Sequence, residues 1–219
     1  MRVSIVGYTQ PNEEFEHDFT DIQDFIAFCA RVSNPANQNN KETADKLIRY
    51  LIKNKHWSPF EMASVTLEVE TTRDIARQLL RHRSFSFQEF SQRYADPNSL
   101  GDIFVAREAR LQDDKNRQNS IDIEDPALEG KWISLQKRVW EEAMIAYNFA
   151  IKSGIAKEQA RCVLPEGNTL SRLYVNGTIR SWIHYIELRT SNGTQKEHIE
   201  VAKACAEVIS KIFPIIDKV

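Results

Sequence analysis

The side chains best suited to chemistry gather in residues 77–93, a stretch with four arginines, one histidine and one glutamate. Arg73, Arg77 and Arg81 recur every four residues and share one face of a predicted helix. No carboxylate lies beside them on that face, so their mutual repulsion favours an anionic partner. Arginine suits phosphates and planar anions because its guanidinium donates two parallel hydrogen bonds. The spacing therefore indicates a binding site for an anion.

The residues after this helix add further polar groups. Ser91 and Arg93 can donate hydrogen bonds to a ligand, and Glu89 can accept one from an amide or a ribose. His82 lies between two arginines, whose charges lower its pKa and favour a neutral ring that stacks or donates one hydrogen bond. The alternative is a solvated basic helix followed by a capped turn, because Ser86-x-x-Glu89 also fits a capping box.

A second group of polar and basic side chains lies in the last third of the chain. It comprises Arg161, Arg172, Thr178, Arg180, His184 and Arg189. Arg180, His184 and the neighbourhood of Arg189 recur at roughly helical spacing, which predicts a basic edge on a helix over 178–190. Trp182 and Ile186 occupy a different face and are expected in the core. Without other context, an ordinary amphipathic surface helix explains this pattern better.

The three cysteines, at positions 29, 162 and 205, form no recognisable site. They are far apart and make no CxxC motif, so neither a disulfide framework nor a zinc site is expected, and no metal site is predicted. Cys162 lies beside Arg161, but the apolar neighbours of this thiol and the lack of a nearby histidine indicate a core residue rather than a nucleophile. The other two cysteines fit apolar helical patterns. His17 and His198 have no partner that the sequence identifies.

The hydrophobic pattern predicts the elements that carry these residues. The expected strands are 2–7, 65–69, 103–105 and 170–176, and the expected helices are 21–32, 41–54, 73–81, 127–152, 156–163, 178–190 and 195–213. Along the helix over 127–152, apolar residues recur every four positions at Leu135, Val139, Ala143 and Tyr147, and Gly154 fits its C-cap. Residues 84–101 are expected to be irregular and 112–126 to form a solvated loop. We expect an α+β fold, a single domain over 1–219 with a small mixed or antiparallel sheet flanked by long helices.

Composition places the chain among ordinary globular proteins. It has 219 residues, of which 42% are hydrophobic and 27% charged, and this length suffices for a real core. The formal net charge is −2, whereas proteins that hold long duplex DNA by charge usually carry a basic excess. We find no signal peptide and no apolar run near the roughly 18 residues of a membrane span. We therefore expect a cytoplasmic protein that binds neither nucleic acid nor membrane.

Several blocks along the chain, in order, resemble the family of flavin-dependent thymidylate synthases. The most specific match consists of Arg81-His82-Arg83, seven further residues and then Ser91, extended by Gln78, Glu89, Arg93 and Tyr94. Further similar blocks lie at residues 30–33, 56–61, 160–165 and 180–189. The resemblance therefore covers nearly the whole chain, and a chance match to this spacing of rare residue types is improbable.

The resemblance implies a reaction, its ligands and an assembly. The expected reaction is the reductive methylation of dUMP to dTMP without a cysteine nucleophile. FAD is the expected cofactor, with NADPH and methylene-tetrahydrofolate as co-substrates. The flavin carries the hydride, so the protein supplies positioning and electrostatics. The family likeness also implies a homotetramer whose active sites are built from several subunits.

The resemblance further implies roles for single residues. The expected FAD-binding residues are Ser58, Arg81, His82, Arg83, Glu89, Thr178, Ile179, Arg180 and His184. The expected dUMP-binding residues are Gln78, Leu79, Leu80, Arg81, Glu89, Phe90, Ser91, Gln92, Arg93, Arg161 and Arg189. Arg189 is the expected catalytic residue, because it matches the arginine that lies against the pyrimidine and favours its ionised form. Ser91 has no evident base beside it and is expected to bind the substrate rather than attack it.

The sequence departs from the family at positions that face the flavin there. Thr178 and His184 stand where related chains can carry asparagine, and Gly193 stands where a histidine can occur. Threonine and histidine still form hydrogen bonds, so FAD binding is expected to survive these changes. A turn over 192–195 is expected, with its backbone and the Gln195 side chain reaching toward the cofactor.

Two other functions remain open. One is a single-stranded nucleic-acid binding module in which bases stack on Phe85, Phe87, Phe90 and Tyr94 between the arginines. The other is a flavoprotein that oxidises NADPH and has lost methylation. The acidic net charge and the second group of motifs argue against the first. The presence of both Arg161 and Arg189 argues against the second.

Overall fold

A four-stranded antiparallel sheet organises the chain in the computed structural model, which describes residues 1–12, 14–15, 19 and 21–218. The strands are β1 (Arg2–Tyr8), β2 (Ser64–Thr72), β3 (Ser86–Glu89) and β6 (Leu170–Thr178), in the order β1-β2-β6-β3. The α-helices are α1 (Ile22–Ala30), α2 (Ala44–Lys53), α3 (Arg73–Leu79), α4 (Pro126–Lys152), α5 (Lys157–Ala160), α6 (Ile179–Thr190) and α7 (Lys196–Ser210). This arrangement confirms the expected α+β fold. His17 lies outside the described residues.

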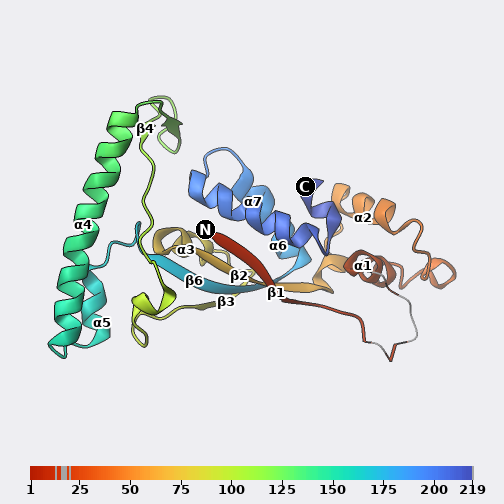
Figure 1. Ribbon diagram of the computed structural model, residues 1–219. Coiled ribbons are helices and arrows are strands. Elements are labelled where there is room, and N and C mark those ends of the chain that lie inside the picture. The colour runs from red at the N-terminus through yellow and green to blue at the C-terminus, as the bar shows by residue number, and fades with distance from the viewer. Residues whose placement is uncertain (13, 16–18, 20, 219) are drawn as a thin grey trace.

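The two faces of the sheet differ in chemistry. In β2, Val65, Leu67 and Val69 are completely buried, and the helices α3, α6 and α7 cover their side of the sheet (Figure 1). The alternating residues on the other face pair across β2 and β6: Thr66 with Asn176, Glu68 with Tyr174, and Glu70 with Arg172. The alternation predicted from the sequence is therefore correct.

Two helices grow directly out of the two central strands. β2 ends at Thr72 and α3 begins at Arg73, while β6 ends at Thr178 and α6 begins at Ile179. The Thr178 side chain accepts a hydrogen bond from the Ser181 N–H and so caps α6. Because the two strands are antiparallel neighbours, α3 starts at one end of the sheet and α6 at the other. Both helices then pack on the same face, where Trp182 and Ile186 enter the core as expected.

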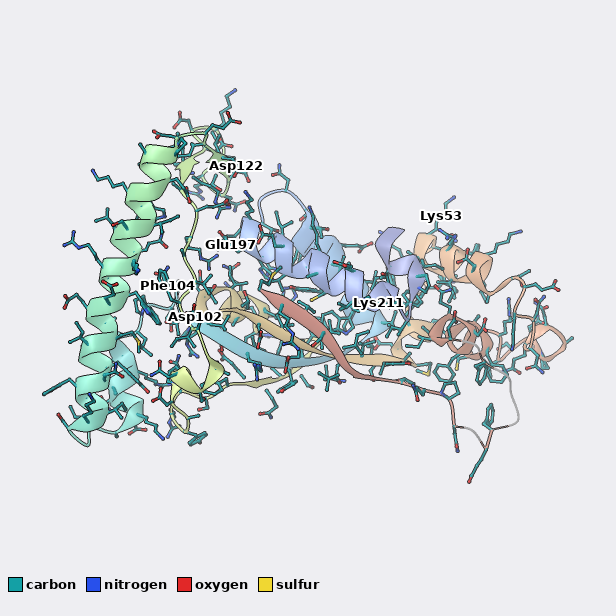
Figure 2. The ribbon with its side chains drawn as sticks, in the orientation of Figure 1. Lys53, Asp102, Phe104, Asp122, Glu197 and Lys211 are labelled. Atoms are coloured by element: carbon teal, nitrogen blue, oxygen red, sulfur yellow. The ribbon has the colours of Figure 1, made fainter. Side chains whose placement is uncertain are left out.

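The long helix α4 stands apart from the sheet and packs against α5 (Figure 1). Asp125 caps its start by accepting from the N–H groups of residues 127 and 128, and Gly154, at φ +78°, follows its end. Of the apolar line expected along it, Tyr147 is buried, but Leu135 is 41% exposed and Val139 is 59% exposed. Figure 2 shows side chains projecting from α4 on several sides. The helix is therefore only partly covered by its own chain.

Several local expectations were wrong. Residues 84–101 were expected to be irregular, but residues 86–89 form β3 because this segment pairs with β6, and the alternative capping box at Ser86 and Glu89 is therefore absent. The stretch 103–105 provides a single bridge, from Phe104 to Thr169, and not a strand. Part of the expected loop 112–126 belongs to a hairpin of β4 (Arg110–Gln112) and β5 (Ser120–Asp122). Cys162 is exposed rather than buried, because it lies in the short 3-10 helix Arg161–Val163 on the surface, whereas Cys205 is completely buried.

Candidate active site

The tripeptide Arg81-His82-Arg83 lies in a tight turn that joins α3 to β3. The helix ends at Leu79, and the turn continues through hydrogen bonds from His82 N–H to the Leu79 carbonyl and from Phe85 N–H to the His82 carbonyl. Arg81 is therefore beyond the helix, not on its face as expected. The Arg81 and Arg83 side chains are exposed, and neither forms an ion pair with any described residue. Two guanidinium groups without a carboxylate partner among the described residues thus flank a histidine.

Contacts with β6 and α6 hold this turn in place. The Phe85 ring is buried against Trp182, with ring centroids 4.5 Å apart. Gly177 in β6 leaves the space for this ring, because a Cβ atom there would overlap it. The Ser181 hydroxyl donates a hydrogen bond to the Ser84 carbonyl at 3.2 Å. The turn is therefore held in place by the Phe85 ring, which fits only because Gly177 opposite it has no side chain.

Arg189 reaches back from the end of α6 to His82. Its Nε donates to His82 Nε2 at 2.9 Å, which leaves the proton of the neutral ring on Nδ1. Burial and then the charge of Arg189 lower the pKa of His82 to about 4. The predicted neutral ring is thus confirmed, but the cause is burial and a distant arginine rather than the neighbouring arginines in the sequence.

The arginines of α3 have carboxylate partners that the sequence does not reveal. Arg73 pairs with Glu89 at 3.3 Å, and Arg77 pairs with Glu166. The expectation of an uncompensated basic helix face was therefore wrong, since both partners come from distant segments. Glu89 also accepts from the Ser171 hydroxyl through the same oxygen, Oε1. Its Oε2 has no partner within the described part of the chain.

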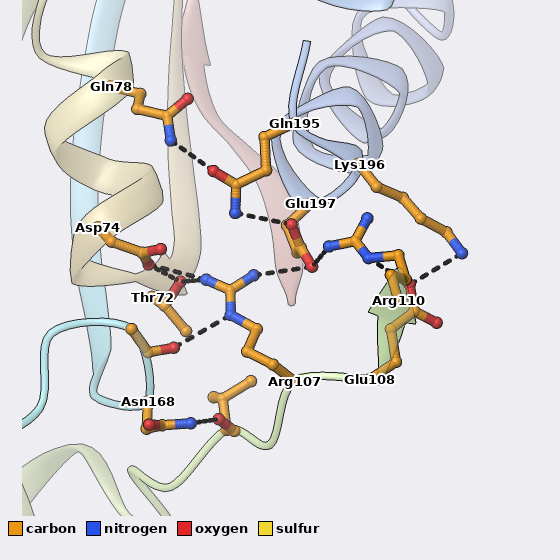
Figure 3. A network of polar contacts seen from close by, with 12 residues as sticks. Thr72, Asp74, Gln78, Arg107, Glu108, Arg110, Asn168, Gln195, Lys196 and Glu197 are labelled. Carbon is orange, nitrogen blue, oxygen red and sulfur yellow. Dashed lines mark hydrogen bonds and ion pairs between the residues drawn. The ribbon is translucent and has the colours of Figure 1, made fainter. Parts of the chain in front are cut away.

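Gln78 is held at both ends of its side-chain amide. Its Nε2 donates to Gln195 Oε1 at 2.8 Å, and its Oε1 lies 3.2 Å from Nδ1 of the buried His198 (Figure 3 shows the first contact). The expected turn before Gln195 is present, with Gly193 at φ +87°. His198, for which the sequence identified no partner, therefore contacts a residue of the candidate site.

A separate group of expected residues surrounds the short 3-10 helix Ser58–Glu61. Arg180 pairs with Glu61 at 2.6 Å, and the ring of His184 lies edge-on to Trp57 with centroids 4.5 Å apart. Ile179 has a completely buried side chain and donates its N–H to the Ala63 carbonyl. The expected single basic edge on α6 was wrong, because Arg180 and His184 face this 3-10 helix whereas Arg189 faces His82.

The remaining expected residues follow β3. Phe90 and Ser91 are half-buried, and Gln92 is buried. Arg93 pairs with Glu158 of α5 at 3.4 Å, and Lys157 donates to the Tyr94 carbonyl, so this segment is tied to α5. Arg161 follows α5 and is half-buried, with no side-chain partner among the residues described here. Leu79 is buried and Leu80 half-buried beneath the turn.

Neither a metal cluster nor a membrane helix is found in the described part of the chain. No group of three or more histidine, cysteine, aspartate or glutamate residues is placed to hold a metal ion within it. Its helices are all too short or too polar to cross a bilayer. The site therefore consists of guanidinium, amide, imidazole and carboxylate groups, which suit a polyanionic ligand with amide and ribose edges.

Comparison with solved structures identifies the class of protein. The chain is similar to the UMP/dUMP methylase PolB from Streptomyces cacaoi, solved with 5-Br dUMP, at a TM-score of 0.82 and 28% identity, over 99% of this chain and 93% of that one. The same methylase bound to 5-Br UMP gives a TM-score of 0.79 over 99% and 92% of the two chains, at 26% identity. The fold is thus that of a nucleotide methylase.

Comparison with sequences identifies the family. Residues 17–215 match the family model described as thymidylate synthase complementing protein. A probable flavin-dependent thymidylate synthase of Paramecium bursaria Chlorella virus 1 is 50% identical over 100% of this chain and 98% of its own length. The flavin-dependent thymidylate synthase of Synechocystis sp. is 46% identical over 99% and 97%. The chain belongs to the flavin-dependent thymidylate synthases, a family of methyltransferases.

Proposed function

We propose that this chain methylates dUMP to dTMP with methylene-tetrahydrofolate as one-carbon donor and NADPH as reductant, through FAD. In this reaction the one-carbon unit forms a bond with C5 of the uracil, and the hydrogen on C5 leaves as a proton. The hydride that originates in NADPH completes the methyl group, and tetrahydrofolate leaves. The proposed enzyme acts as one domain over residues 1–219 and works in the cytoplasm.

The contact between Arg189 and His82 carries this proposal. Arg189 belongs to the residues assigned to dUMP and His82 to those assigned to FAD, and the two side chains meet at 2.9 Å. A pyrimidine beside Arg189 and a flavin beside His82 are then neighbours, as a hydride transfer requires. Gln78 and Glu89 lie on either side of the same turn in the sequence and supply further polar contacts to the nucleotide.

The residues of the site fit a flavin nucleotide. Arg81 and Arg83 offer exposed guanidinium groups, unpaired within the described residues, that suit the FAD diphosphate. Ser58, Thr178, Ile179, Arg180 and His184 are assigned to the same cofactor from the other side of α6. The flavin, when bound, supplies hydride chemistry that no amino-acid side chain provides.

The side chains of this chain then bind, orient and stabilise charge. The guanidinium of Arg189 lies beside the pyrimidine and favours its ionised form, which makes C5 electron-rich. Ser91, Arg93 and Arg161 bind the nucleotide and do not attack it. Cys162 is exposed, but no described base contacts its thiol, so we assign it no catalytic role.

We also propose that the enzyme is a homotetramer with shared active sites. The support is the apolar surface along α4, where Val139, Ile145 and Phe149 are each more than half exposed. A monomer rarely exposes such a row of large apolar side chains unless a partner covers it. Arg161 directly follows α5, which packs against α4. Subunits that meet on α4 therefore bring the Arg161 guanidinium toward the active site of a neighbouring subunit.

A flavin spectrum followed by a tritium-release assay tests the function. The purified protein is expected to show flavin absorbance, or to acquire it with FAD. It is expected to release tritium from dUMP labelled at C5 when NADPH and methylene-tetrahydrofolate are present. A protein that binds oligonucleotides and no flavin contradicts the proposal. A protein that oxidises NADPH without releasing tritium also contradicts it.

A further inference from the structure

A continuous row of hydrogen bonds crosses the core behind Gln78. The Tyr185 hydroxyl lies 3.1 Å from His198 Nε2, and His198 Nδ1 lies 3.2 Å from Gln78 Oε1. Gln78 Nε2 donates to Gln195 Oε1 at 2.8 Å, and Gln195 Nε2 donates to Glu197 Oε2 at 2.9 Å. Tyr185 and His198 are almost completely buried. We call these five residues the amide relay.

An ionised carboxylate ends the amide relay. Glu197 Oε1 accepts from Arg107 at 3.2 Å and from Arg110, and Figure 3 shows both arginines converging on it. Burial opposes the ionisation of Glu197, but hydrogen bonds from Arg110, its own backbone and Gln195 outweigh burial and lower its pKa to about 2. Burial, together with the charges of Arg189 and His82, lowers the pKa of His198 to about 3, so this ring is neutral. The relay thus has a charged end and a neutral centre.

The carboxylate fixes the direction of every hydrogen bond in the relay. An ionised carboxylate only accepts, so the Gln195 amino group must face Glu197 and its carbonyl must face Gln78. The Gln78 amino group then donates to Gln195, and its carbonyl needs a donor from His198 Nδ1. Because the ring is neutral, its Nε2 accepts from the Tyr185 hydroxyl. The hydrogen-bond partners alone therefore decide which end of the Gln78 amide is which.

We propose that Tyr185, His198, Gln195 and Glu197 are positioning residues that fix the orientation of the Gln78 amide toward the nucleotide. One N–H and one acceptor position of that amide remain unused by the relay, and these present a donor and an acceptor at fixed places. This inference rests on the proposed function, in which Gln78 contacts dUMP. The other four residues of the relay act through Gln78, which makes the contact with the nucleotide.

Glu197→Gln tests the relay because it preserves shape and reverses polarity. The carbonyl of the new amide faces the two arginines, so its amino group donates to Gln195. Both glutamine amides then turn over, and His198 carries its proton on Nε2 instead of Nδ1. The FAD-loaded protein with 15N-labelled histidine reports this tautomer by NMR. Five histidines are present, and a His198→Asn sample identifies the relevant signals.

The affinity for dUMP, measured by calorimetry on the same samples, is the second readout. We expect Glu197→Gln to reverse the His198 tautomer and to weaken dUMP binding roughly tenfold. The reason is that the Gln78 amide is turned over, so its amino group then faces a donor of dUMP where its carbonyl did before. The flavin spectrum is expected to stay unchanged. Asp74→Asn is the matched control, because it removes a carboxylate that pairs with Arg107 at 2.8 Å but lies outside the relay. The control is expected to keep both tautomer and affinity.

A second variant, Gln195→Met, cuts the relay and leaves the arginines on Glu197. It is expected to give a mixture of both His198 tautomers and weaker dUMP binding, and it serves if Glu197→Gln does not fold. An unchanged tautomer in these variants overturns the relay. A changed tautomer with unchanged dUMP affinity overturns the positioning role. A third outcome concerns the wild-type protein. If its His198 carries the proton on Nδ1 but the protein binds no dUMP, the proposed function and the positioning role are both overturned. The direction of the hydrogen bonds then still stands.

Discussion

At the scale of single residues, the side chains of the candidate site are organised by partners that lie far away in the chain. His82 meets Arg189, Gln78 meets His198, and Glu89 pairs with Arg73. The sequence could reveal His82, Glu89 and Arg189 as chemically capable, because their types and spacing are unusual. It could not reveal the pairing, since each contact depends on how α3, α6 and α7 lie against the sheet.

Removal of the Arg189 guanidinium is expected to disable methylation and to spare flavin binding. Arg189→Ala takes away the charge that stabilises the ionised pyrimidine, so we expect kcat for tritium release to fall roughly 100- to 1000-fold. The flavin absorbance of the purified variant is expected to match the wild type. Arg49→Ala provides the control, because its exposed guanidinium pairs within α2 with Asp45. Near-normal turnover in Arg189→Ala would refute the assigned role.

The half-buried His82 and the buried His198 are expected to make the fold sensitive to mild acid. His82 and His198 have folded-state pKa values of about 4 and about 3, both below the unfolded value of roughly 6.5. Below pH 6.5 these two histidines bind protons in the unfolded chain but not in the folded chain. The stability present above pH 6.5 is therefore lost as the pH falls toward these folded values. Glu197 adds little pH dependence above pH 4.5, because its pKa is lowered from 4.5 to about 2 and the stability that it contributes is lost only as the pH falls through this range.

Urea unfolding at pH 6.5 and pH 4.5 measures this effect. We expect the free energy of unfolding to drop on the order of 2–3 kcal/mol for His198 alone between these pH values. His198→Asn is expected to reduce the drop, whatever its effect on stability at pH 7. An equal drop in the variant and the wild type would show that His198 is not the source. The quantity to compare is the change in the free energy of unfolding between pH 6.5 and pH 4.5, and not the stability at either pH.

At the scale of elements, the junction of β6 with α6 determines where the arginine turn lies. Phe85 inserts beside Gly177, and the Ser181 hydroxyl donates a hydrogen bond to the Ser84 carbonyl of the turn. Nothing in the local sequence predicts this close approach, because an isolated glycine in a strand has several possible roles. The same limit explains why β3 was missed: four residues carry little pattern, and pairing with β6 creates the strand. Long periodic elements such as α4 were predictable from their own residues.

A methyl group at position 177 is expected to push the arginine turn out of place. The Cβ of Gly177→Ala overlaps the Phe85 ring, so we expect a loss of roughly 1–3 kcal/mol in the free energy of unfolding. Flavin binding is expected to weaken as well, because Phe85 anchors the turn that holds Arg81 and Arg83. Thermal unfolding and flavin titration check both outcomes.

Gly130→Ala is the matched control for this substitution. Gly130 lies inside α4, where no described atom beyond the local helix backbone lies within 4 Å of the added Cβ. Alanine is the better helix former, so we expect a gain of roughly 0.5–1 kcal/mol and unchanged flavin binding. If the two variants behaved alike, the close approach of Phe85 and Gly177 would have no energetic weight.

At the scale of the whole molecule, α4 extends as an arm away from the sheet (Figure 1), and several large apolar side chains along it, Phe149 among them, are more than half exposed. The sequence predicts this helix and its periodic apolar residues correctly, but such a periodic stripe does not show which chain covers it. Leu135 and Val139 fit a core helix in pattern, yet both are exposed here. A partner subunit that packs on α4 would cover these two side chains, in line with the proposed tetramer.

A charge placed on this arm is expected to break the assembly. Phe149 is 66% exposed, and we expect Phe149→Glu to lower the mass seen by light scattering from about four times the 25.4 kDa of one chain. Circular dichroism is expected to remain unchanged, because the side chain packs little within its own chain. Activity is expected to fall with the mass, since the proposed active sites are shared. Tyr50→Glu, at a 55% exposed position on α2, is expected to change neither mass nor activity. A wild-type protein with the mass of one chain and full activity would instead mean that the uncovered arm serves no assembly.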